Sequence, residues 1–190
     1  MYWSGDDYDQ IEMLAIDIYL DYDIHSFPVS ATEICKKLGI TLLPYSKYDD
    51  EDAAILLLKS KDACFFPATT NYGNLIVYND SIKSKGRQRF SIFHDLKHYV
   101  NNDIEERDYD EDMANHFSRY FMCPTPYLIA KKITQCDLIA STFLVSPDTA
   151  SNITTSLDNR LKRYGEKIFD YEKPLLKHLL GEDYDGGDEI

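Results

Sequence analysis

The sequence predicts an α+β protein with a helical N-terminus, a small antiparallel sheet, a pair of helices that carry the site residues and a helical C-terminal segment. Apolar residues recur at three- and four-residue spacing from Tyr8 to Tyr22 and again from Arg87 to Val100, as they do on amphipathic helices. Between these stretches lie short runs rich in Ile, Leu, Phe and Tyr, separated by polar turns, which are typical of strands.

The N-terminal half contains two expected helices followed by the expected sheet. After the helix over residues 8–22, Ser30-Ala31-Thr32-Glu33 forms a capping box for a second helix, and Gly39 is placed for a left-handed turn at its end. Asn71-Tyr72-Gly73 is expected to close the last hairpin. The expected strands are residues 40–45, 53–58, 63–67 and 75–78.

The C-terminal half is expected to be helical. The helix over residues 87–100 has an apolar side, and the acidic run 103–112 leads into a helix from Glu111 to Met122, which Cys123-Pro124 and Pro126 end. Shorter helices are expected over residues 127–130, 137–143 and 147–164. We expect a core over residues 1–130, a helical segment packed on it over 131–180, and an acidic flexible tail over 181–190.

Composition excludes several function classes. The 190 residues include 33 acidic and 20 basic ones, and the formal charge of −13 repels phosphate backbones, so we expect no direct nucleic-acid ligand. The N-terminus is acidic and polar where a signal peptide needs a basic flank and an apolar run, and we expect no membrane segment. Widely spaced cysteines favour buried thiols in a reducing cytoplasm; these are Cys35, Cys64, Cys123 and Cys136.

The run His94-Asp95-Leu96-Lys97-His98 is the strongest functional signal. Histidines four residues apart on a helix share one face, and Glu111 at the start of the next helix can reach them if the two helices are antiparallel. Two imidazoles and a carboxylate are a common Zn²⁺ ligand set. Asp95 stands where the zinc-hydrolase signature His-Glu-x-x-His has its general base. The alternative is a pair of surface histidines that bind no metal.

The other histidines, His25, His116 and His178, have no ligand spacing to another histidine, so we expect them to be structural or exposed. His116 lies on the same predicted helix as Glu111 and is the one that could reach the site.

Three segments of this chain resemble the ImmA/IrrE family of metallopeptidases. Residues 86–98 (GRQRFSIFHDLKH) are similar to the family's R-x-R-F-[TS]-x-x-H-E-x-x-H helix, residues 111–118 (EDMANHFS) to its E-x-x-A-N-x-F-A helix, and residues 122–124 (MCP) to its Met-Pro-like stop. Residues 137–164 also resemble the family's helical region.

The resemblance implies a zincin-like core and a cytoplasmic zinc endopeptidase that regulates transcription by cleaving a protein substrate, a helix-turn-helix repressor of the XRE type. His94, His98 and Glu111 match the metal ligands, and Asp95 matches the catalytic glutamate. The sequence departs from the pattern twice, because Asp95 is one methylene shorter than glutamate and Lys97 replaces a residue that is commonly glycine.

Two other hypotheses compete with the peptidase. The shorter Asp95 side chain favours a catalytically impaired family member that binds a repressor or antitoxin without cutting it. Direct DNA binding through the C-terminal helices is supported by their helix-turn-helix appearance and by Arg160, Lys162 and Arg163, but the net charge of −13 weighs against it. Candidates for stabilising an oxyanion are Tyr99, His116 and Arg89.

The charge balance makes a first prediction. Because a net charge of −13 opposes contact with phosphates, the isolated protein should show no salt-sensitive binding to duplex DNA when fluorescence anisotropy is measured from low to moderate ionic strength. Tight, sequence-selective binding by the protein alone would favour the DNA-binding hypothesis instead.

Overall fold

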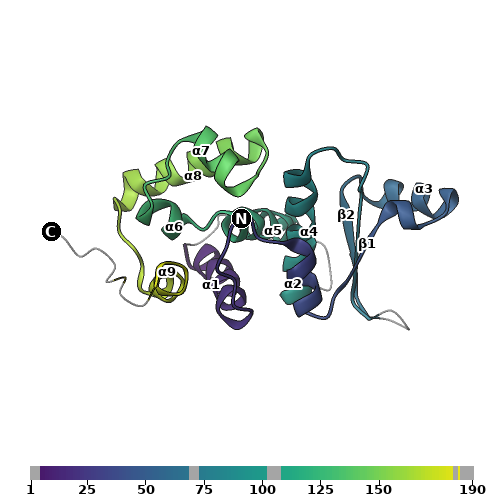
Figure 1. The fold of residues 1–190 in the computed structure, drawn as a ribbon, viewed down its shortest axis with the longest axis horizontal. Coiled ribbons are helices and arrows are strands. Elements are labelled where there is room, and N and C mark those ends of the chain that lie inside the picture. Colours follow the sequence, from purple (N-terminus) through teal and green to yellow (C-terminus); the bar gives the residue numbers. More distant parts are fainter. Residues whose placement is uncertain (1–4, 69–72, 102–107, 182–183, 185–190) are drawn as a thin grey trace. The chain divides into compact units, whose positions relative to one another are not determined.

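A computed structural model describes residues 5–68, 73–101, 108–181 and 184 (Figure 1). Its internal contacts divide the chain into two compact units, which we call the sheet unit (residues 30–118) and the helical unit (residues 1–29 and 119–190). The expected α+β class is confirmed, since helices accompany a three-stranded sheet. The boundary at residue 130 stays a prediction, and most of the predicted tail over 181–190 lies outside the described residues.

The sheet is mixed rather than antiparallel throughout. Its strands are β1 (Thr41–Pro44), β2 (Ala63–Phe66) and β3 (Leu75–Tyr78), in the order β1-β3-β2. Strands β2 and β3 pair antiparallel as expected, but β1 runs parallel to β3. The chain crosses through a helix and β2 before it returns as β3, so β1 and β3 point the same way. Asn71 and Tyr72 of the predicted turn fall outside the described residues.

The strand predicted over residues 53–58 is wrong, because this stretch belongs to helix α3 (Asp50–Lys59). Asp49 caps the helix, its side chain accepting a hydrogen bond from the backbone N–H of Asp52 at 2.9 Å. Carboxylates in the first turn stabilise the helix by interacting with the positive end of its dipole, and the Ala and Leu residues that follow are strong helix formers. Leu56 is the residue that this helix buries.

Both faces of the sheet are covered within the sheet unit. On one face, a small core lies under the turn η1 (Tyr45–Lys47) and α3; its buried members are Tyr45, Leu56, Cys64 and Val77. Alternate residues point to the other face, where α4 (Lys85–Val100) packs on β2 and β3. There the rings of Phe65 and Tyr99 meet with centroids 5.8 Å apart. This packing anchors α4 to the sheet.

Helix α2 (Ala31–Lys37) has the ends that the sequence predicts. The Ser30 hydroxyl accepts a hydrogen bond from the backbone N–H of Glu33 at 3.3 Å, and Gly39 has the left-handed φ of +70°. The Tyr99 hydroxyl donates to the carbonyl of Leu38 at 3.4 Å, which joins α4 to the end of α2.

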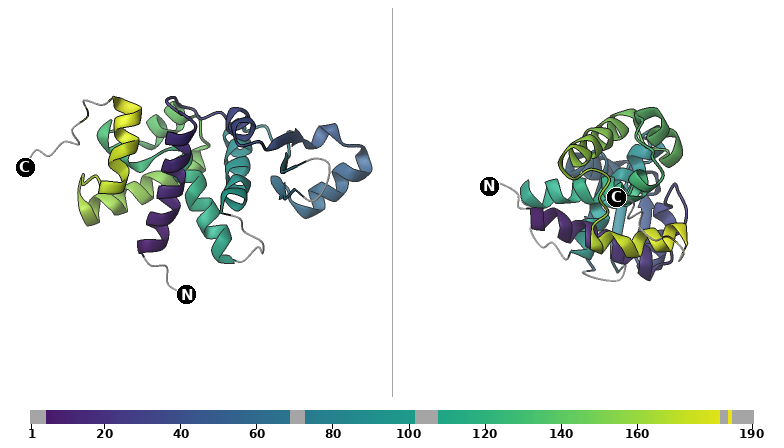
Figure 2. Two further views of the ribbon diagram at one scale, coloured as in Figure 1. Left: turned by 90° about the horizontal axis from the view of Figure 1, so that it is seen from below. Right: turned by 90° about the vertical axis from the view of Figure 1, so that its left-hand side faces the viewer.

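The helical unit is built around a second core. Tyr19 donates its hydroxyl proton to the carbonyl of Phe121 at 2.6 Å, and the Phe27 ring packs against Tyr127 and Phe143. Helices α1 and α9 lie side by side (Figure 2). The elements are α1 (Gly5–Asp21), the end of α5 (Asp108–Met122), α6 (Thr125–Ala130), α7 (Cys136–Phe143), α8 (Pro147–Tyr164), η2 (Asp170–Glu172) and α9 (Lys173–Leu180).

Arg160, one of the basic residues considered for DNA binding, is used inside the helical unit. Its guanidinium pairs with the fully buried Glu172 at 2.6 Å and lies over the Phe169 ring. A phosphate would have to compete with that buried carboxylate. Within the described part of the chain, no helix combines the length and the apolar composition that crossing a bilayer requires.

Candidate metal centre

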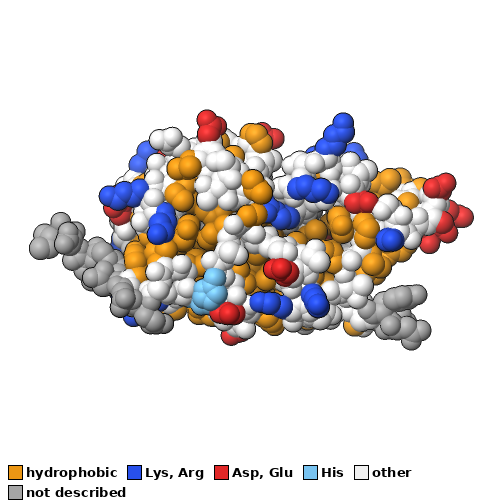
Figure 3. Space-filling view, viewed as in Figure 1, with side chains coloured by type: hydrophobic (Ala, Val, Ile, Leu, Met, Phe, Trp, Pro, Cys, Tyr) orange, Lys and Arg blue, Asp and Glu red, His pale blue; other side chains and the backbone are white. Residues whose placement is uncertain are grey.

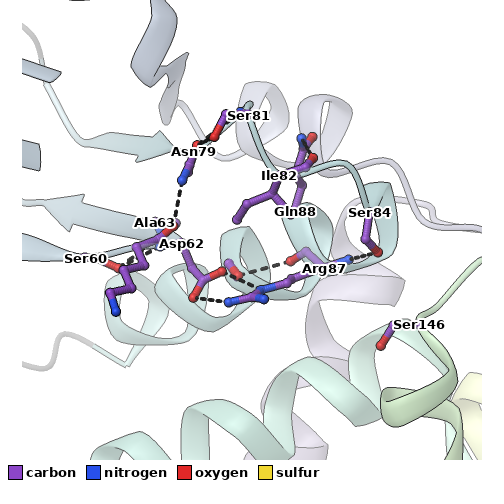
Figure 4. A network of polar contacts seen from close by, with 12 residues as sticks. Ser60, Asp62, Ala63, Asn79, Ser81, Ile82, Ser84, Arg87, Gln88 and Ser146 are labelled. Carbon is purple, nitrogen blue, oxygen red and sulfur yellow. Dashed lines mark hydrogen bonds and ion pairs between the residues drawn. The ribbon is translucent and has the colours of Figure 1, made fainter. Parts of the chain in front are cut away.

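Polar contacts fix the start of α4 beside β2 (Figure 4). The Ser84 hydroxyl accepts a hydrogen bond from the backbone N–H of Arg87 at 3.2 Å, and the Gln88 amide donates to the carbonyl of Ile82 at 2.6 Å. Arg87 binds both carboxylate oxygens of Asp62, at 2.7 and 3.0 Å. Because Asp62 directly precedes β2, this two-bond contact ties the helix to the sheet edge.

The three residues that the sequence nominates as metal ligands lie together. His94 and His98 share one face of α4, and Glu111 reaches them from α5. The Nε2 atom of His94 is 3.0 Å from one carboxylate oxygen of Glu111, and the Nε2 atom of His98 is 3.3 Å from the other. These separations resemble the ~3.3 Å expected between ligand atoms at the corners of a tetrahedron around Zn²⁺.

The donor chemistry also fits a cation. His94 Nδ1 lies 3.3 Å from the side-chain oxygen of Asn115 and donates its proton there, so Nε2 presents a lone pair to Glu111. The Nε2 lone pair and the carboxylate oxygen repel each other, and a cation bound between them would remove that repulsion. Burial lowers the pKa of His94 despite the opposing charge of Glu111, which favours the neutral imidazole that a metal requires.

Asp95 lines the same cavity as the three candidate ligands. The cavity has a volume of about 460 Å³ and is bounded by α4, α5 and the start of β2. Asp95 is 9% exposed, and its charge adds to the effect of burial in raising the pKa of the Tyr45 hydroxyl and the Cys64 thiol. Asp95 thus lies within electrostatic reach of β2, and Cys64 stays a protonated thiol rather than a nucleophile.

Sequence reasoning overlooked two residues of this cavity. Asn115 lies four residues after Glu111, so the helical repeat alone could have placed it beside the ligands. Asp62, the partner of Arg87, carries no motif that would have singled it out. The three candidates for an oxyanion-stabilising residue are not among the described residues that line the cavity; they are Tyr99, His116 and Arg89.

Lys97 does not crowd the cavity, because it is fully buried on another side of α4. Its ammonium lies 3.4 Å from the carbonyl oxygen of Asp110 and 3.9 Å from a carboxylate oxygen of the same residue. Asp110 is also buried, with 1% of its surface exposed. Since Glu111 directly follows Asp110, this contact holds the start of α5 where its carboxylate can meet the two histidines.

A second group of possible ligands lies in the helical unit and is satisfied without a metal. His25 Nε2 pairs with Asp23 at 2.7 Å, and His25 Nδ1 contacts the carbonyl of His178 at 3.0 Å. The two imidazoles stack with centroids 3.8 Å apart, and His178 Nε2 contacts the carbonyl of Ile24. These contacts agree with the expectation that both histidines are structural.

The ligand geometry predicts one tightly bound zinc ion per chain. His94→Ala or Glu111→Ala should abolish stoichiometric binding, and Asn115→Ala should weaken it by about 10- to 100-fold because it removes the partner that orients His94. Competition with a fluorescent chelator measures the affinity, and His178→Ala is the matched control. Full zinc affinity in the Glu111→Ala protein would contradict the ligand assignment.

The buried Lys97 contact makes a prediction for stability. Lys97→Met leaves the Asp110 carboxylate buried without its cation and should lower the free energy of unfolding by about 3–5 kcal/mol. Lys97→Met combined with Asp110→Asn should recover much of that loss, because the second substitution removes the buried negative charge that faced Lys97. Urea denaturation of the metal-free proteins measures both, and a single variant within about 1 kcal/mol of wild type would contradict the assigned role.

Comparison with known proteins supports a peptidase ancestry for this site. The model of the peptidase family described as the IrrE N-terminal-like domain matches residues 35–152, which include His94, Asp95, His98 and Glu111. No curated protein matches the chain. The match covers more than half of the sequence, and the family resemblance seen in the three motifs is therefore confirmed: this chain belongs to the IrrE N-terminal-like peptidase family.

Proposed function

We propose that this protein is a cytoplasmic zinc-dependent endopeptidase that cleaves a helix-turn-helix repressor of the XRE type. The observation that carries the proposal is the convergence of His94, His98 and Glu111 in one cavity with the carboxylate of Asp95. Two imidazoles, a carboxylate ligand and a further carboxylate are the groups that a hydrolytic zinc site needs. The four free cysteines fit a reducing compartment.

Each residue of the cavity has a defined task in this proposal. When bound, zinc supplies a Lewis acid that polarises a peptide carbonyl and lowers the pKa of water. The ion would be held by His94, His98 and Glu111. Asn115 orients His94. Asp95 accepts the proton of the attacking water and later passes it to the leaving amine.

The sheet edge offers a place for the substrate backbone. Among the described residues, strand β2 pairs only with β3 and so forms an edge of the sheet, and Ala63 and Cys64 of β2 line the cavity. An extended peptide can add to such an edge through main-chain hydrogen bonds, which recognise a backbone irrespective of its sequence. A scissile bond held along β2 would then lie beside Asp95 and the ligands.

The competing function is capture of the repressor without cleavage. The observation that favours it is the length of Asp95, since a misplacement of about 1 Å at a reacting group can lower a rate on the order of a hundredfold. The binder hypothesis and the slow-peptidase hypothesis use the same fold and the same metal, so only turnover separates them.

Substitution of Asp95 tests the two functions. If Asp95 is the base, Asp95→Glu should raise repressor cleavage by up to about a hundredfold, because the longer side chain reaches the water better. Asp95→Asn should abolish cleavage and leave the zinc content unchanged. The assay is electrophoresis of the repressor encoded beside this gene after incubation with zinc-loaded protein.

The controls for this assay separate the hypotheses cleanly. Asp62→Asn, at a carboxylate of the same cavity that Arg87 already pairs, should not abolish cleavage as Asp95→Asn does. If wild type, Asp95→Asn and Asp95→Glu are equally inert while all three hold zinc and capture the repressor, the peptidase proposal fails and the protein is a binder.

A further inference from the structure

Helix α3 turns an apolar stripe away from the core of the sheet unit. Ile55, Leu57 and Leu58 are 57%, 45% and 88% exposed, and Leu58 is the most exposed large hydrophobic residue in the described part of the chain. Ala54 is also exposed. Glu51, Ala54, Ile55 and Leu58 recur at helical spacing on one side of α3, and Leu57 lies at the margin of that side. Leu56 points into the core.

Packing within the sheet unit does not account for this stripe. Leu56 alone gives α3 its buried contact, so polar residues at positions 55 and 58 would leave that contact unchanged. Leaving such side chains in water forgoes burial free energy of about 1.5–3 kcal/mol each. Contiguous exposed apolar residues on one helix face are typical of a surface that binds another protein.

Charge on the same helix indicates what kind of protein would bind. Asp49, Asp50, Glu51 and Asp52 are all exposed and form the beginning of α3. Carboxylates gather over α3, next to apolar side chains (Figure 3). Asp49 serves as the cap, but Glu51 lies on the same side as Ala54 and Ile55. A complementary surface would carry an apolar ridge flanked by Lys or Arg.

The stripe is continuous along the chain with the candidate metal centre. Lys59 ends α3 and Ser60 follows it, and both line the cavity that holds Asp95 and the ligands. All of these residues belong to the sheet unit. A protein bound on α3 would therefore lie beside the helix end that lines the cavity.

We propose that α3 is a docking surface for the protein substrate, which binds through an amphipathic helix bearing basic residues. The docking surface consists of Glu51, Ala54, Ile55, Leu57 and Leu58. Ala54 and Leu58 are four positions apart and Ile55 and Leu58 three, which is the spacing with which one helix packs against another. The inference rests on the proposed function in one respect, namely that the docked protein is the one to be cleaved.

The test measures docking apart from cleavage. The probe is the helix-turn-helix repressor encoded beside this gene, titrated into the full-length, zinc-loaded Asp95→Asn protein by isothermal calorimetry. Adding Ile55→Ser and Leu58→Ser together should raise the Kd at least tenfold. Glu51→Gln should weaken binding at low salt and reduce its salt dependence. The matched control is Leu138→Ser, at a residue of α7 that is 44% exposed.

A second measurement excludes a general defect. With Asp95 restored, the Ile55→Ser, Leu58→Ser protein should keep the wild-type melting temperature and the wild-type rate on a short peptide that contains the cleavage site, while its KM for the intact repressor rises. An equal rate loss on both substrates would show that α3 supports the cavity and would overturn the docking proposal.

Three other outcomes would also overturn it. The first is a Kd for the repressor that the double substitution leaves unchanged. The second is binding of the wild type to anionic lipid vesicles instead of the repressor. The third is a concentration-dependent dimer that the double substitution disperses, which would identify a second copy of the chain as the occupant. Failure of the peptidase proposal can be distinguished from failure of the docking proposal. If the repressor binds in a way that depends on α3 but is not cleaved, the docking surface is supported and only the catalytic role of Asp95 is lost.

Discussion

The position of Glu111 relative to α4 is the constraint on which the site depends. Two histidines on one helix supply only two donors, and the third must come from a separate helix with little tolerance in position. The buried contact of Lys97 with Asp110 provides that precision, because Asp110 and Glu111 are adjacent on α5. On the other side, Asn115 meets His94 one helical turn further along. The ligand carboxylate is thus bracketed by two contacts between the same pair of helices.

Sequence alone predicted that the three candidate ligands come together, because helical spacing translates directly into geometry. His94 and His98 had to share a face, and Glu111 needed only an antiparallel neighbour. It failed for residues 53–58, where an apolar run fits a buried strand or a helix equally well and the capping role of Asp49 decides between them. Sequence reasoning also failed for the direction of β1, which depends on the crossover through α3. It failed for Lys97 as well, because the burial of a lysine depends on a partner elsewhere in the chain, here Asp110.

Charge within the cavity also favours an ion. Arg87 neutralises Asp62 through two hydrogen bonds, and Asp95 and Glu111 bring two further carboxylates to the same cavity. Two like charges in a partly buried cavity repel each other, and the neutral state of His94 offers no compensation. A divalent cation between the ligands balances both carboxylates at once. A metal ion bound here would therefore offset the repulsion between these carboxylates.

Docking on α3 and chemistry at Asp95 affect different kinetic quantities. Binding energy gained away from the reacting bond stabilises the bound substrate and the transition state equally, so it lowers KM and leaves kcat unchanged. A base that is one methylene short lowers kcat, and no docking surface restores that. At substrate concentrations below KM, however, the rate depends on kcat/KM, which docking would increase. In the proposed function, an apolar, acidic docking surface on α3 would therefore let a slow zinc peptidase act selectively on one protein, and the cavity itself would need little sequence preference.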